Sequence, residues 1–162
     1  LKLENGEPMP TLAQYLEAAK DTKVHLVLEL KPHATPEAET AAAEAVVKMV
    51  GRYGLSKRVT YISFSLHVMK ELARLAPAKT QLMYLGGGTL PKDLKAMGLT
   101  GCDFNYGVYL NNPTWLNDIK ALKMASNVWT VNNPADMIWA IENRVDFITT
   151  DRPDLFLKLT RK

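Results

Sequence analysis

The sequence predicts an α/β fold in which parallel strands alternate with helices, as in a (β/α)8 barrel. Two observations predict this fold. Runs of β-branched and aromatic residues recur along the 162 residues, and each run is followed by a turn and a segment with helical spacing of apolar residues. No linker or change in composition interrupts the series. We therefore expect a single domain with parallel strands joined by crossover helices.

Six segments have the composition of strands, and seven have the spacing or the start signals of helices. The predicted strands are 23–30, 59–64, 80–85, 102–106, 127–131 and 145–149. The predicted helices are 11–19, 35–53, 65–75, 91–98, 112–122, 135–143 and 153–159. The first helix begins with a capping box, Thr11 to Gln14. In the second helix we expect a buried stripe that includes Ala42 and Ala45.

Alternating strands and helices also occur in open doubly wound sheets, which usually carry a glycine-rich turn after the first strand. Here that turn is 31–34 and contains no glycine, and the three glycines of 86–88 lack the spacing of a dinucleotide site. The barrel is therefore favoured, although six strands are two fewer than a complete barrel contains.

Composition excludes several classes of protein. Twenty Lys and Arg against 17 Asp and Glu give a net charge of +3, and no basic block marks a nucleic-acid surface. The apolar runs have the length of strands, so we expect no transmembrane segment. The single cysteine, Cys102, has no partner for a disulfide and is expected to be a small buried side chain.

Chemistry in such folds takes place at the carboxyl ends of the strands. At the end of the first strand, alternation places Glu29 and Lys31 on one side and Leu28 and Leu30 on the other. Glu29 could bind a hard divalent cation and Lys31 an anionic substrate. A structural ion pair between the two explains the pattern equally well. The other strand ends interleave polar groups with aromatic ones, which suits a small polar ligand with an apolar portion.

Five short motifs follow one another along the chain, each of them once. The motifs are Pro10-Thr11-Leu12, Glu29-Leu30-Lys31, Ile62-Ser63-Phe64, Trp129-Thr130-Val131-Asn132 and Thr149-Thr150-Asp151-Arg152-Pro153. In this order and at these separations they resemble the glycerophosphodiester phosphodiesterase family. The resemblance implies a TIM barrel of which residues 1–162 are the carboxyl-terminal part, with the last six βα units. It also implies hydrolysis of glycerophosphodiesters to glycerol 3-phosphate and an alcohol, with Ca²⁺ or Mg²⁺ as cofactor.

The resemblance assigns roles to four residues. Glu29 matches a metal ligand, and Lys31 matches a catalytic lysine near the substrate phosphate. Phe64 and Trp129 match residues that line the substrate cleft. The family's His-Arg-Gly and Glu-x-Asp motifs are absent from this sequence, and with them the two catalytic histidines and two of three metal carboxylates. Because a Ca²⁺ site needs about six oxygens, we expect the 162-residue chain alone to be inactive.

Two alternatives stay open. One is a relative of the sphingomyelinase or phospholipase D type, since leaving-group specificity lies in loops. The other is a non-catalytic six-stranded α/β module that binds a small anion through Lys31. The localisation is left unknown, with a periplasmic or secreted protein slightly favoured over a cytoplasmic one. The oligomeric state is left open, although strands at the sheet edges are prone to association.

Overall fold

Six parallel strands form one sheet in the computed structural model, which describes residues 2–160. The strands are β1 (Leu26–Glu29), β2 (Val59–Ser63), β3 (Gln81–Tyr84), β4 (Gly101–Asn105), β5 (Ala125–Trp129) and β6 (Phe147–Ile148). They lie in chain order from β1 to β6, and every neighbouring pair is parallel. A doubly wound sheet would reverse its order at a switch point. The predicted barrel-type α/β fold is therefore confirmed, as a curled half-barrel.

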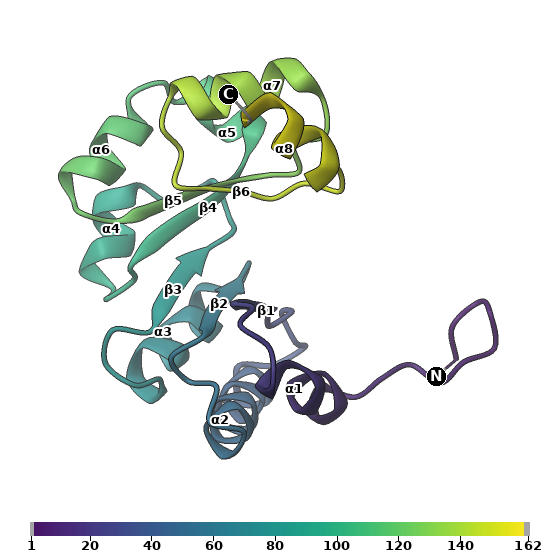
Figure 1. The fold of residues 1–162 in the computed structure, drawn as a ribbon. Helices are drawn as coiled ribbons and strands as arrows, with labels where there is room; N and C mark the ends of the chain where they lie inside the picture. The colour runs from purple at the N-terminus through teal and green to yellow at the C-terminus, as the bar shows by residue number, and fades with distance from the viewer. Residues whose placement is uncertain (1, 161–162) are drawn as a thin grey trace.

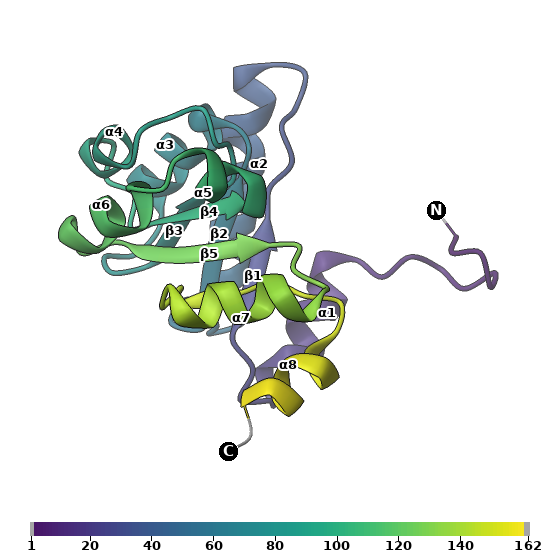
Figure 2. The same ribbon diagram turned by 90° about the horizontal axis from the view of Figure 1, so that it is seen from above.

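Eight helices cover this sheet within residues 2–160. They are α1 (Leu12–Lys20), α2 (Pro36–Arg52), α3 (Leu66–Leu75), α4 (Pro91–Ala96), α5 (Tyr106–Asn111), α6 (Trp115–Ala121), α7 (Pro134–Glu142) and α8 (Pro153–Thr160). Figure 1 shows the sheet curling from β1 to β6, with most of the helices on its outer side. Both views show residues 2–11 extending away from the rest of the molecule (Figures 1 and 2). None of the described helices is long and apolar enough to cross a bilayer.

The hydrophobic core lies between the outer face of the sheet and the helices. Tyr61, Leu82 and Phe104 point into this layer from three neighbouring strands, and all are buried. The inner face is open in residues 2–160, and Val27 on that face is 59% exposed. Removing apolar side chains from water drives the packing of the outer layer. The two faces of the sheet therefore differ: the outer face packs against the helices and stabilises the fold, and the inner face lines a cavity.

Most predicted elements are present, with two corrections. The capping box at Thr11 is confirmed, but the buried stripe of α2 runs through Glu39, Ala43 and Val50, whereas Ala45 is exposed. The alanine-rich sequence of α2 gives little apolar contrast, so it does not define the phase of the helix. The strand predicted over 102–106 ends one residue earlier. Helix α5, which was not predicted, begins there and is capped by the side chain of Asn105.

Candidate active site

The carboxyl ends of the strands surround a cavity of about 280 Å³. Its lining comes from all six strands or the loops that follow them: Glu29, Lys31, Ile62, Phe64, Leu85, Asp103, Trp129, Thr130 and Thr149. All four residues to which the sequence resemblance assigns a role lie in this set. Parallel strands bring their carboxyl ends to one rim, which explains how residues a hundred positions apart share one cavity.

Glu29 and Lys31 form an ion pair at the rim. Lys31 Nζ donates a hydrogen bond of 2.6 Å to Glu29 Oε1. Leu30 is buried on the opposite side of the strand, as the alternation predicted. The Lys31 side chain is 71% exposed, and an ion pair with so exposed a partner contributes little to stability. The ammonium group is therefore free to leave Glu29 for an anionic ligand at small cost.

Two aromatic rings form another wall of the cavity. The rings of Phe64 and Trp129 meet edge to face, with centroids 5.8 Å apart and planes at 87°. Trp129 Nε1 donates to the backbone oxygen of Asp103 at 2.9 Å, which fixes the indole ring. Phe64 is 43% exposed, so it is not a core residue of this chain. The rim thus offers an apolar surface beside the charged pair.

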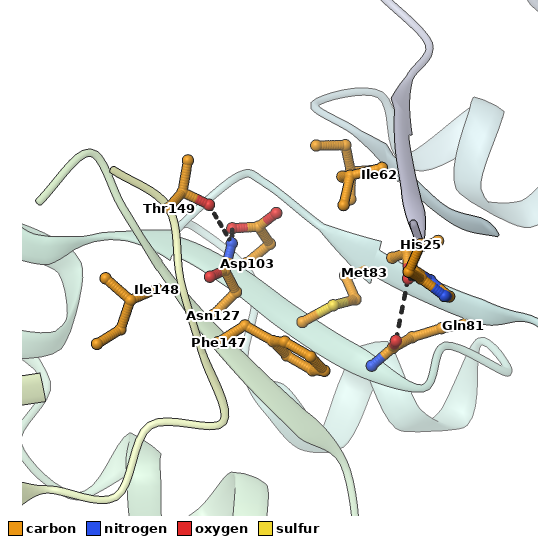
Figure 3. A pocket seen from close by; sticks show the side chains of 11 residues that line it. His25, Ile62, Gln81, Met83, Asp103, Asn127, Phe147, Ile148 and Thr149 are labelled. Atoms are coloured by element: carbon orange, nitrogen blue, oxygen red, sulfur yellow. Dashed lines mark hydrogen bonds between the residues drawn. The ribbon is translucent and has the colours of Figure 1, made fainter. Parts of the chain in front are cut away.

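Asp103 is a cavity residue that the sequence analysis missed. It is 2% exposed, and Asn127 Nδ2 donates to its Oδ1 at 2.6 Å and to Thr149 Oγ1 at 2.8 Å. Figure 3 shows these three side chains converging on the inner face of the sheet. Burial raises the pKa of the Asp103 carboxyl to about 6; the hydrogen bond from Asn127 opposes this shift, and the nearby charge of Glu29 adds to it.

The signal for Asp103 was the alternation within its own strand. Its neighbours Cys102 and Phe104 are buried on the outer face, so Asp103 has to point inward. Asp103 lies two positions before the last residue of its strand, whereas the predicted site residues lie at the strand ends or directly after them. The burial expected for Cys102 is confirmed, and burial raises the pKa of its thiol to about 12. This cysteine is therefore an unreactive core residue.

Two loops at the rim are joined by side chains. Asn132 Nδ2 donates to Asp151 Oδ2 at 2.8 Å. Asn132 Oδ1 accepts from the Asp151 backbone N–H at 2.9 Å and from Thr150 Oγ1 at 3.1 Å. Val131 N donates to Thr149 O just before this point. The Asn132 side chain thus continues the pairing of β5 with β6 beyond the ends of the strands.

Within the described residues, the rim does not complete a metal site. No group of three or more His, Cys, Asp or Glu side chains in residues 2–160 is arranged to hold an ion. Ca²⁺ takes six to eight oxygen ligands, and Mg²⁺ takes six in an octahedron. Glu29 supplies one carboxylate, and its partner in the structure is Lys31. These residues alone therefore do not fit a bound divalent cation.

A curled parallel sheet with charged and aromatic side chains at its strand ends defines a barrel-type α/β protein with its site at the carboxyl rim. The chain matches the glycerophosphoryl diester phosphodiesterase family over residues 2–155, and it belongs to that family. The resemblance that the sequence motifs indicated is confirmed.

Individual relatives agree with this membership. A glycerophosphodiester phosphodiesterase of Caldanaerobacter subterraneus subsp. tengcongensis is 29% identical over 164 residues, covering 97% of this chain and 64% of the relative. The crystal structure of a glycerophosphodiester phosphodiesterase from Parabacteroides distasonis has a TM-score of 0.94 at 48% identity, covering 98% of this chain and 67% of that structure. The chain therefore spans about two thirds of the length of these relatives.

A third structure shares the fold at lower identity. An Oleispira antarctica phosphodiesterase, solved in complex with the product sn-glycerol-3-phosphate, has a TM-score of 0.79 at 19% identity. The match covers 92% of this chain and 60% of that one. At this identity the likeness concerns the fold alone.

Proposed function

We propose that the full-length protein hydrolyses glycerophosphodiesters to glycerol 3-phosphate and an alcohol, with Ca²⁺ or Mg²⁺ as cofactor. The observation that carries this proposal is the cavity at the rim. It brings together Glu29, Lys31, Phe64 and Trp129, the four residues to which the sequence resemblance assigns a role. The product named for the Oleispira antarctica phosphodiesterase is the one that this reaction releases.

The chemistry of a phosphodiester explains why these groups are needed. Its negative charge repels nucleophiles, so catalysis requires positive charge at the phosphate oxygens. The exposed ammonium of Lys31 provides such charge when it leaves Glu29 for the substrate. Glu29 is the proposed metal ligand of this chain, and a complete site for a divalent cation would need further oxygen ligands beside it. Phe64 and Trp129 provide an apolar surface for the carbon atoms of the substrate.

Substitution of Lys31 tests the proposal in the full-length protein. We expect Lys31→Ala to lower kcat/KM for sn-glycero-3-phosphocholine by about a hundredfold or more, because it removes charge stabilisation at the phosphate. Glu29→Gln is expected to weaken activation by Ca²⁺ or Mg²⁺. Lys48→Ala, on the exposed surface of α2, is the matched control and should retain activity. Release of glycerol 3-phosphate, measured with a coupled dehydrogenase assay, is the readout.

The substrate that is cleaved separates this proposal from the alternatives. A wild-type protein that releases no glycerol 3-phosphate with either metal contradicts it. Cleavage of sphingomyelin or lysophosphatidylcholine in place of glycerophosphocholine would identify a relative with another leaving-group specificity.

A further inference from the structure

Glu39 in α2 is a buried carboxylate that the proposed chemistry does not use. Glu39 is 6% exposed, although it lies in the first turn of a helix, where acidic side chains usually face water. Both carboxylate oxygens accept hydrogen bonds. His33 N donates to Oε1 at 3.2 Å, and Ser65 Oγ donates to Oε2 at 2.8 Å.

The two donors belong to the two loops that carry residues of the proposed site. His33 lies two positions after Lys31, and its Nδ1 is 2.8 Å from the backbone oxygen of Lys31. A carbonyl oxygen only accepts, so Nδ1 carries the proton in this contact. Ser65 directly follows Phe64 and caps α3 by accepting from Val68 N. Glu39 therefore connects the backbone beside Lys31 with the side chain of Ser65, the residue next to Phe64.

Side chains are needed for this connection because the backbone pairing of β1 with β2 ends before these loops. The pairing extends as far as Leu30, whose N–H donates to Ile62 O at 2.9 Å. Next to it, Ser63 Oγ donates to Leu30 O at 2.6 Å and accepts from Ser65 N at 3.0 Å. The hydrogen bonds of Glu39 to His33 and Ser65 are the contacts between the two loops that lie farthest from the strands.

A carboxylate suits the position for two physical reasons. It offers acceptors to two donors at once, and a buried donor without a partner would cost about 1–3 kcal/mol. It also lies in the first turn of α2 and contacts the capping residue of α3, so the positive ends of two helix dipoles stabilise its charge. The charge is buried where its surroundings compensate for lost hydration.

We propose that Glu39 is a positioning residue, which sets the distance between the Lys31 ammonium and the Phe64 ring in the substrate cleft. The inference rests on the proposed phosphodiesterase function and extends it to a residue that touches no substrate. Its effect is carried through the backbone N–H of His33 and the hydroxyl of Ser65. Loss of Glu39 lets the two loops move apart, so the cleft binds the substrate less tightly.

The experiment compares Glu39→Ala and Glu39→Gln in the full-length protein, with Glu44→Ala on the exposed side of the same helix as control. We expect E39A to raise KM for sn-glycero-3-phosphocholine about tenfold or more, because a displacement of about 1 Å is enough for a large loss. E39Q keeps one acceptor and should give an intermediate KM. Hydrogen exchange at the amides of 31–34 and 63–66 should become faster in E39A and stay unchanged in E44A.

A merely structural role gives a different result. A smaller folded fraction lowers the apparent kcat and leaves KM unchanged. If E39A, assayed at a temperature below its Tm, has the same KM as the wild type, the inference is overturned. If E39A does not fold, Glu39→Asp provides the same test, because its shorter side chain cannot reach both donors. A wild-type protein without phosphodiesterase activity overturns the proposed function itself, and with it the inference.

Discussion

The Asp103 carboxyl binds its proton more tightly in the folded chain than in the unfolded one. Its pKa rises from the ordinary 3.8 to about 6, mainly because burial removes water from the charged form. Between these two values the folded state holds more protons than the unfolded state. The contribution of Asp103 to the free energy of unfolding therefore falls as the pH rises through this range, and its penalty is complete above about pH 6.

Asp103→Asn removes this pH dependence while keeping an acceptor for Asn127. Relative to the wild type, we expect D103N to gain up to about 3 kcal/mol in the free energy of unfolding between about pH 4 and pH 7. Urea denaturation of both full-length proteins across this range measures the difference. Asp93→Asn, at an exposed carboxylate, serves as the control. A difference between D103N and wild type that does not change with pH would contradict the burial argument.

Single residues differ in how well the sequence predicts their place. Glu29 and Lys31 follow from alternation in a strand, a pattern that is strictly local. Glu39 could not be found in this way because its role depends on Ser65, which is 26 positions away and on another element. Its own helix also lacks the apolar contrast that would have indicated which side is buried. Long-range hydrogen bonds leave no periodic signal in the chain.

Between elements, the side chain of Asn132 determines how the last two loops of the rim meet. The strands themselves pair over only two register positions, from Asn127 with Phe147 to Val128 with Ile148. Such a short strand provides few backbone hydrogen bonds. The contacts from Asn132 to Thr150 and Asp151 therefore contribute to the position of Thr130 and Thr149 in the cavity.

Exchanging the amide and the carboxylate tests this contact. Asn132→Asp places two carboxylates face to face, and we expect it to lower the free energy of unfolding by about 1 kcal/mol. In the double variant N132D/D151N the hydrogen bond returns with donor and acceptor reversed, and the net charge equals that of the wild type. Thermal unfolding of the single and double variants measures the effect. A double variant as unstable as N132D would mean that the contact has no such role.

Elements with strong local signals were predicted well, and those without them were not. Helix α1 has a capping box and α7 has an asparagine cap followed by proline, and both begin as expected. Helix α5 has an asparagine cap at Asn105 but neither a capping box nor a proline after the cap, and its one and a half turns begin directly at the end of β4 and contain Gly107. It packs on β4, and Tyr109 donates its hydroxyl proton to Asn127 O at 2.9 Å. Its stability comes from these tertiary contacts, which propensity does not describe.

At the scale of the whole molecule, the inner face and both edges of the sheet are open within residues 2–160. A cavity of about 600 Å³ lies against the inner face, and apolar side chains that include Val27 line it. Figure 3 shows two others, Ile62 and Phe147. Strands β1 and β6 are the edges of the sheet. Unpaired strand edges and exposed apolar surface both favour association.

The isolated 162-residue chain is therefore expected to associate and to be inactive. Sedimentation velocity should show a weight-average mass that rises with concentration, because the edges of two copies can pair. Val27→Lys places a charge on the edge strand β1 and should reduce this association. The chain should release no glycerol 3-phosphate from sn-glycero-3-phosphocholine with Ca²⁺ or Mg²⁺, since its described residues provide one metal carboxylate at the rim. A stable monomer with metal-dependent activity would show that the half-barrel is a sufficient catalytic unit. In that case other residues of this chain would have to complete the metal site at Glu29.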